Sequence, residues 1–365
     1  MKHTLSSFLL FALLILAGCA GPSATTASAQ TPDFVYVCNQ GEATVSVIDT
    51  ALNEVVATVD LKELGYPENA KPHHIAVEPD GSFWYVSLIS GNRVLKFNRD
   101  NELVGMAEMQ VPGMVILSPA DDKLYIGRSM SAVNPPQSIG VIERSTMEID
   151  EVDVFFPRPH ALAVTPDGGL VLSASLAENR MIALDQDTGD GVFTSFDGDI
   201  HSLVQFAISP DGRTAIAGGE LTSELFFLDI SEDGEVSIRG SMEVGDRPWH
   251  PVFAPDSRHA YVPNKGANAV SVVDTQAMEV VAVIEGQGMA QPHGSALSAD
   301  GRFLYVSQQN TGAPMDMSPG ATMSGHEGHQ MPGMVTVIDT EAREIVKVLQ
   351  IGMLPSGVGS RGVSR

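Results

Sequence analysis

Residues 254–274 read APDSRHAYVPNKGANAVSVVD, and this stretch decides the fold. It begins with the turn Ala254-Pro255-Asp256-Ser257, in which proline fixes one φ angle and the aspartate side chain can bond back to its own backbone. Two runs follow, 259–264 and 269–274, and both alternate with the period of two expected of β-strands. The stretch therefore predicts a β-hairpin.

The same unit recurs along the chain. Comparable turns begin at residues 78, 118, 165, 209, 254 and 298, which are 40 to 47 residues apart. A unit of four short strands repeated at this period is typical of a β-propeller. Four strands per unit place six complete blades at 73–111, 114–156, 160–197, 203–244, 250–284 and 293–351.

A seventh blade is divided between two distant segments. Residues 34–60 hold only three strands, and residues 354–359 supply the missing innermost strand. Sharing one blade in this way closes the ring and leaves no sheet edge open. We therefore predict an all-β, seven-bladed β-propeller over residues 33–365, closed by pairing of the N- and C-terminal segments in one blade.

Three runs carry a family resemblance. They are Phe34–Asn39 (FVYVCN), His259–Asn264 (HAYVPN) and Phe303–Ser307 (FLYVS), and each is followed by a Val-x-Val-x-Asp strand. With them the chain resembles the YVTN family of bacterial β-propellers. The resemblance implies the propeller fold and leaves the function open, because propellers host binding scaffolds and several chemistries alike.

The first residues carry an export signal. Residues 1–18 pair a basic start with an apolar stretch, which is typical of a signal peptide and too short for a membrane span. The sequence LAGC that ends at Cys19 resembles a bacterial lipobox, and the resemblance implies a lipid anchor on Cys19. Ala20 would then let the lipoprotein pass to the outer membrane, facing the periplasm. The alternative is an ordinary cleaved signal in which Cys19 occurs by chance.

Charge and cysteine content argue against polyanionic partners and against an internal disulfide. Residues 19–32 carry no charge and predict a flexible tether between anchor and propeller. The net charge of −24 argues against nucleic acid and anionic lipid surfaces, since both are polyanions. Cys38 is the only thiol besides Cys19, so the exported domain depends on its core rather than on an internal disulfide.

Histidines gather at one position of the repeat, just before the innermost strand of a blade. Because that strand lines the central channel of a propeller, these residues should ring one mouth of the channel. Neutral imidazole is the commonest transition-metal ligand, and a nearby thioether favours Cu(I). The candidate axial metal ligands are His73, His74, Met114, His160, His201, His250 and His293, with His201 about three residues early in register.

The adjacent pair His73-His74, with single histidines in later blades and the segment 80–85 (DGSFWY), also resembles the propeller half of nitrous oxide reductase. This resemblance implies a multicopper centre on axial histidines. The chain departs from that pattern at Met114, where a histidine would help, and it has no cupredoxin domain. The alternative is that the Pro-His rings only bond backbone carbonyls of the neighbouring blade.

Three basic residues precede prolines at the same repeat position: Lys71, Arg158 and Arg247. In a chain with 21 basic and 45 acidic residues, they would form a local positive region that attracts a small anion such as a carboxylate or phosphate. The alternative is that each pairs with an acidic neighbour on the rim.

The last blade departs from the repeat through an insertion over residues 311–333. A Gly- and Pro-rich loop is expected on the surface, where methionine has no core to fill. Soft sulfur with imidazole selects Cu(I), and the pattern resembles the Met/His-rich loops of periplasmic copper-resistance proteins and multicopper oxidases. The candidate ligands are Met315, Met317, Met323, His326, His329, Met331 and, at the re-entry to the sheet, Met334. The alternative is a disordered insertion with oxidation-tolerant methionines.

No nucleophile elbow, phosphate-binding loop, haem-attachment motif or zinc-protease helix is present in the sequence. We therefore expect a lipid-anchored binding or scaffold protein of the cell envelope that handles copper. One alternative is an enzyme with a His/Arg-ringed axial site, either multicopper or acting on a lactone or phosphate ester. Another is a structural module that binds a second envelope protein.

Overall fold

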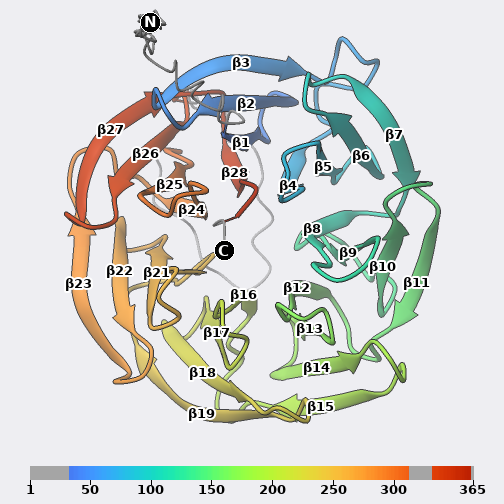
Figure 1. The fold of residues 1–365 in the computed structure, drawn as a ribbon, viewed down its shortest axis with the longest axis vertical. Helices are drawn as coiled ribbons and strands as arrows, with labels where there is room; N and C mark the ends of the chain where they lie inside the picture. Colours follow the sequence, from blue (N-terminus) through green and yellow to red (C-terminus); the bar gives the residue numbers. More distant parts are fainter. Residues whose placement is uncertain (1–32, 312–330, 363–365) are drawn as a thin grey trace, which may run out of the picture. The chain divides into compact units, whose positions relative to one another are not determined.

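A computed structural model describes residues 33–311 and 331–362. Over these residues the strands form seven four-stranded antiparallel sheets, arranged as blades around a central axis (Figure 1). The prediction of an all-β, seven-bladed propeller is confirmed. No helix in residues 33–311 and 331–362 is long and apolar enough to span a membrane.

Blade one combines the last strand of the chain with the first three, and blades two and three each use four consecutive strands. Blade one contains β28 (Pro355–Gly359), β1 (Phe34–Asn39), β2 (Thr44–Asp49) and β3 (Glu54–Asp60) from the axis outward. Blade two contains β4 (Pro72–Val77), β5 (Phe83–Leu88), β6 (Arg93–Asn98) and β7 (Leu103–Glu108). Blade three contains β8 (Pro112–Leu117), β9 (Lys123–Arg128), β10 (Ser138–Glu143) and β11 (Ile149–Asp153).

The remaining four blades repeat the arrangement. Blade four contains β12 (Pro159–Val164), β13 (Leu170–Ser175), β14 (Arg180–Asp185) and β15 (Gly191–Ser195), and blade five contains β16 (Leu203–Ile208), β17 (Thr214–Gly219), β18 (Glu224–Ile230) and β19 (Val236–Glu243). Blade six contains β20 (Val252–Phe253), β21 (His259–Asn264), β22 (Ala269–Asp274) and β23 (Glu279–Glu285). Blade seven contains β24 (Pro292–Leu297), β25 (Phe303–Gln308), β26 (Met334–Asp339) and β27 (Glu344–Gln350).

The hydrophobic core lies between neighbouring blades rather than in a single centre. Between blades one and two, the Tyr36 ring stacks on Trp84 at a centroid distance of 4.8 Å, and Trp84 stacks on Phe97 at 4.2 Å. The two middle strands of a blade are buried on both faces, so they read as nearly continuous apolar runs. The outermost strands alternate between exposed and half-buried residues.

The ring is closed as the sequence predicts. β28 pairs antiparallel with β1, with Tyr36 opposite Gly359 and Val37 opposite Val358 (Figure 1). The Ser356 hydroxyl donates to the His73 carbonyl of blade two at 3.1 Å. A Cβ at Gly357 would lie 2.4 Å from that same carbonyl oxygen, so this close approach of two backbones requires glycine.

One backbone feature recurs in all seven blades and positions the candidate site. The residue that precedes the innermost segment has a positive φ of 43° to 60°, and its carbonyl accepts an N–H from the residue that follows the second strand. The seven pairs are Leu354 with Gln40, Lys71 with Ile89, Val111 with Ser129, Arg158 with Leu176, Ser202 with Glu220, Arg247 with Lys265, and Gln291 with Gln309. We call the end of the axis marked by these pairs the mouth.

Candidate functional site at the propeller axis

Five histidine rings from four blades gather at the mouth. They are His73 and His74 of blade two, His160 of blade four, His250 of blade six and His293 of blade seven, and we call them the axial histidine cluster. Ring centroids lie 5.8 Å apart for His73 and His160, and 5.7 Å apart for His74 and His250. The rings of His250 and His293 are 5.1 Å apart. The predicted convergence of histidines from distant blades is therefore present.

His74 is half-buried and the other four histidines of the cluster are buried, and this burial keeps the rings neutral. Burial, opposed by a backbone hydrogen bond in each case, lowers the pKa of His74 and of His160 to about 4. Burial and neighbouring charged or titratable groups lower the pKa of His73, His250 and His293 well below 6.5. At pH 7 each ring therefore has one nitrogen with a hydrogen and one with a free lone pair.

Two rings bond a backbone carbonyl of the neighbouring blade. His160 Nδ1 lies 2.7 Å from the Arg128 carbonyl oxygen, and His74 Nδ1 lies 3.1 Å from that of Val115, both in blade three. This is the arrangement that the alternative interpretation of the Pro-His positions expects. It orients these two rings and directs their Nε2 atoms away from the bonded carbonyls.

Other ring nitrogens of the cluster have no hydrogen-bond partner. Across the described part of the chain, this holds for both nitrogens of His73 and for one nitrogen each of His160, His250 and His293. Buried polar atoms are nearly always hydrogen-bonded, so a group of unpartnered nitrogens at one place indicates a missing ligand or solvent. No three His, Cys, Asp or Glu side chains in residues 33–311 and 331–362 are arranged to hold a metal ion together.

Two of the predicted axial ligands lie elsewhere. Met114 is fully buried in the core between blades three and four, with Tyr125 and Phe156. His201 lies inside blade five, where its Nδ1 is 2.9 Å from the Thr222 hydroxyl and its Nε2 is 2.8 Å from the Asp197 carbonyl. Neither residue belongs to the axial histidine cluster.

The three predicted cations differ in their surroundings. Lys71 is exposed, Arg158 is half-buried and donates to the Met130 carbonyl, and Arg247 is 9% exposed. Over residues 33–311 and 331–362, none of the three forms an ion pair with a carboxylate within 4.0 Å. The Arg158 Nε atom is buried without a hydrogen-bond partner among the described residues, and the Arg158 charge acts on His160 of the cluster. Arg247 instead lies close enough to act on Lys265 and Glu220.

Sequence reasoning did not single out Lys265 and Trp249. Lys265 is 5% exposed, and its Nζ lies 4.2 Å from the centre of the Trp249 ring, which is 5.1 Å from the His293 ring. Burial, partly offset by Glu220 and reinforced by Arg247, lowers the pKa of Lys265 to about 8. Its position in the repeat could have pointed to Lys265. It is the first residue after the second strand of its blade, and in every blade this residue lies at the mouth.

Most of the predicted insertion ligands lie in the part of the sequence that the structure does not describe. Met315, Met317, Met323, His326 and His329 lie outside the described residues, as does Cys19. Met331 is 53% exposed, and Met334 begins β26 opposite Gln350.

The described ends of the insertion lie at the mouth. Thr311 donates through its amide and its hydroxyl to the side chain of Gln291, at 3.1 Å and 2.7 Å. Gln291 is the mouth residue of blade seven. On the other side, the Gly333 amide donates to the Gly352 carbonyl at 3.2 Å. The insertion therefore leaves and rejoins the propeller beside the mouth.

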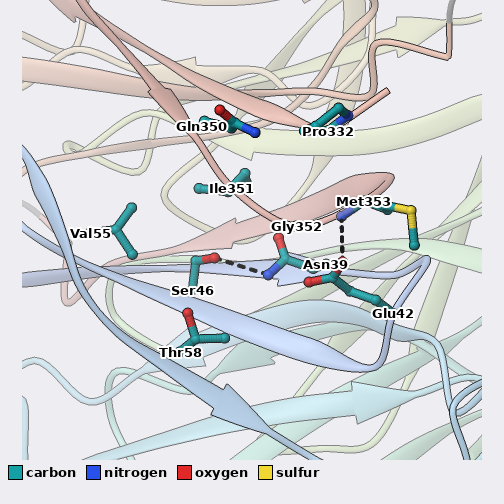
Figure 2. A pocket seen from close by; sticks show the side chains of 10 residues that line it. All are labelled: Asn39, Glu42, Ser46, Val55, Thr58, Pro332, Gln350, Ile351, Gly352 and Met353. Carbon is teal, nitrogen blue, oxygen red and sulfur yellow. Dashed lines mark hydrogen bonds between the residues drawn. The ribbon is translucent and has the colours of Figure 1, made fainter. Parts of the chain in front are cut away.

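A pocket of about 580 Å³ opens near the point of re-entry, between blade one and the link from β27 to β28 (Figure 2). Its lining includes Asn39, Glu42, Pro332 and Met353. The Glu42 carboxylate accepts from the Met353 amide at 3.2 Å, and Asn39 donates to Ser46 at 2.9 Å. The Glu42 carboxylate, the charged group of this lining, is thus bonded within the protein.

Three curated proteins match the sequence. The uncharacterized protein YwhL of Bacillus subtilis is 26% identical over 93% of this chain and 67% of its own length. Antigen Lp49 of Leptospira interrogans is 24% identical over 67% of the chain and 55% of its own length. The uncharacterized protein YncE of Salmonella typhimurium is 28% identical over 30% of each chain, which agrees with the YVTN-type resemblance. No model of a known protein family matches the chain.

Solved structures share the fold. A functionally unknown protein from Desulfotomaculum acetoxidans superposes with a TM-score of 0.71 at 15% identity, over 91% of this chain and 100% of that one. Kuenenia stuttgartiensis hydrazine synthase has a TM-score of 0.62 at 20% identity, over 79% and 89% of the two chains. The dihydro-heme d1 dehydrogenase NirN has a TM-score of 0.61 at 14% identity, over 90% and 75%. At these identities the likeness concerns the propeller alone.

Proposed function

We propose that this β-propeller is a copper-binding protein of the cell envelope, anchored by a lipid on Cys19 to the outer membrane and facing the periplasm. It acts by holding the ion rather than by catalysis. One observation carries the proposal: the axial histidine cluster offers several buried, neutral imidazoles with unpartnered nitrogens at one place. Neutral imidazole suits copper, and the signal and lipobox patterns suit the envelope.

The donors at the axis come in pairs. His73 with His160 and His250 with His293 are the neighbouring pairs that would hold an ion between them. Two imidazoles suit Cu(I), which accepts few ligands, whereas Zn²⁺ in structural sites requires four. The hydrogen bond from His160 to the Arg128 carbonyl would fix the orientation of that ligand, as second-shell contacts do in metal sites.

The insertion would serve as the capture element of the same function. Its thioethers and its two histidines match Cu(I), and its described ends lie beside the mouth. In this proposal the insertion captures an ion and passes it to the axial histidine cluster. This arrangement gives each of the two predicted metal sites a distinct role.

Copper retention of the chelator-treated protein tests the proposal. We expect the protein to retain at least one equivalent of Cu(I) after dialysis, measured by elemental mass spectrometry. Replacing His73, His160 and His293 together by glutamine should lower the retained amount by about one equivalent, and deleting residues 312–330 should lower it further. The matched control is His259→Gln, which changes a surface histidine outside the cluster.

Two outcomes would overturn the proposal. If the unaltered protein retains no copper, neither site handles the metal. If the triple glutamine variant retains as much as the unaltered protein, the axial histidine cluster is not a copper site. Fractionation of a Cys19→Ser variant checks the anchor separately, since the proposal expects this variant to leave the membrane fraction.

A further inference from the structure

Two buried cations beside the axial histidine cluster have no counter-ion in the protein. Lys265 is 5% exposed and Arg247 is 9% exposed. Over residues 33–311 and 331–362, neither side chain makes an ion pair within 4.0 Å or a hydrogen bond to a protein acceptor. Burying a charge without a partner is strongly unfavourable, and two like charges near each other make it worse.

The backbone holds these two cations together. The Lys265 amide donates to the Arg247 carbonyl at 2.8 Å, which is the contact that every blade repeats at the mouth. In each of the other six blades, at most one of the two residues in this contact is basic. Blade six therefore concentrates positive charge at a point where the fold requires only a backbone hydrogen bond.

The neighbouring groups are mostly donors. The Trp249 ring supports the Lys265 ammonium through a cation–π contact of 4.2 Å, and the Trp249 indole N–H is itself buried without an acceptor. The neutral His293 ring lies 5.1 Å from the Trp249 ring and adds no charge to this group. Donors and cations that converge without acceptors form the complement of an anion.

Glu220 is an acidic group that influences both cations, and the Asp246 carboxylate also lies close by, against Gly266. It occupies the Lys265-equivalent position in blade five, and it forms no ion pair within 4.0 Å among the described residues. Burial raises the pKa of its carboxyl, an effect that Lys265 and Arg247 oppose. Glu220 thus reduces the positive charge of this region without neutralising it.

We infer that Lys265, Arg247 and Trp249 form a binding site for a small oxoanion at the mouth of the propeller. The ligand chemistry is a carboxylate or a phosphate-like group, with two acceptor oxygens for the guanidinium and a third contact from the ammonium. The site is separate in its chemistry from the copper proposal, because cations attract an anion and repel a free metal ion. It replaces the predicted ring of Lys71, Arg158 and Arg247 by a compact group within blade six.

Calorimetric titration of the metal-free protein tests the inference. Oxalate and acetate probe carboxylates, inorganic phosphate and sulfate probe tetrahedral oxoanions, and chloride serves as the reference anion. We expect one of the two probe classes to bind with a stoichiometry near one, and the preferred class identifies the ligand chemistry. Lys265→Gln and Arg247→Gln should each weaken that binding about tenfold or more, since each removes one charged contact.

Lys71→Gln is the matched control, because Lys71 occupies the Arg247-equivalent position of blade two and is exposed. We expect it to leave the affinity within about twofold, which fits an exposed charge that is screened by solvent. An equal loss of anion affinity in Lys71→Gln would overturn the assignment to blade six. It would favour the predicted ring of Lys71, Arg158 and Arg247 instead. Failure of all four probes to bind at millimolar concentration, or unchanged affinity in both blade-six variants, would overturn the site itself.

The outcome of this titration does not decide the copper proposal. The titration uses protein without metal, and the variants leave every axial histidine in place. Loss of anion binding with intact copper retention would separate the two sites in one direction. Loss of copper retention in the triple glutamine variant with intact anion binding would separate them in the other.

Discussion

His201 and His73 are both almost completely buried histidines, yet their surroundings are opposite. Inside blade five, both nitrogens of His201 are hydrogen-bonded, to the Thr222 hydroxyl and the Asp197 carbonyl. At the axis, neither nitrogen of His73 has a partner in the described part of the chain. The first histidine therefore belongs to the architecture of a blade, and the second is available to something that the protein binds.

Arg128 and Lys265 are two buried cations that differ in the same way as the two histidines. The Arg128 guanidinium is fully buried in blade three and donates to the carbonyls of Ser138 and Gln110, and to the Glu151 carboxylate at 2.6 Å. Lys265 at the mouth has the Trp249 ring beneath it and no such acceptors within residues 33–311 and 331–362. The blade walls satisfy their polar groups, whereas the axis leaves them open, as expected where stability is given up for binding.

The largest expected effect is a loss of stability at acidic pH. For His74 and His160, the folded pKa of about 4 lies below the ordinary value of 6.5, so the unfolded chain takes up protons first as the pH falls. Their contribution to stability is present above pH 6.5 and is lost between pH 6.5 and about 4. The metal-free protein should lose roughly 6 kcal/mol between pH 7 and pH 4 from these two rings.

Urea unfolding at a series of pH values measures this loss. Replacing both histidines by asparagine should make the dependence less steep over that range, while His73, His250 and His293 keep their own contributions. A double variant with the same slope as the unaltered protein would show that the rings at the axis are not held neutral by the fold.

The second effect compares the two buried cations. Arg128→Met should destabilise the protein by about 2–3 kcal/mol, because it removes four donated hydrogen bonds, while the half-exposed Glu151 can turn to solvent. Lys265→Met should not lower the stability and should raise it, since it removes a buried charge that has no ion pair among the described residues. Chemical unfolding in a buffer without oxoanions gives both values, and equal losses would contradict the contrast.

The smallest effect compares the two histidines. His201→Leu should lower the stability by about 1–2 kcal/mol, because the Thr222 hydroxyl and the Asp197 carbonyl lose their partner. His73→Leu in the metal-free protein should leave it within about 0.5 kcal/mol or raise it slightly, because the replaced nitrogens have no bonds to lose. A larger loss in His73→Leu than in His201→Leu would assign His73 to the architecture.

The fold was predictable because its signals are local and repeated. Each Pro-Asp-Gly-like turn marks one hairpin, and the shortage of a strand in residues 34–60 pointed to β28 as the partner that closes the ring. The gathering of histidines followed from the same register, since one repeat position in each blade faces the mouth. These inferences needed the period of the repeat and no detail of packing.

The composition of the site was less predictable, because it depends on which side of a strand faces the axis. Met114 occupies the right repeat position, but its side chain enters the core between two blades, a choice that a register inferred to within one or two residues does not fix. Lys265 was missed because its place at the mouth comes from a backbone contact to Arg247, and no sequence motif marks that contact.

The pairing of β28 with β1 also sets an order of events during synthesis. β1 emerges from the ribosome before any other described strand, and its inner neighbour follows roughly 300 residues later. At ordinary rates of elongation this delay is on the order of tens of seconds. Over that time the inner edge of β1 is uncovered, and the backbone of His73 lacks the hydroxyl of Ser356 that later bonds to it. In an exported protein, a chaperone that shields this edge would therefore act on the N-terminal blade as the chain crosses the membrane, before β28 closes the ring.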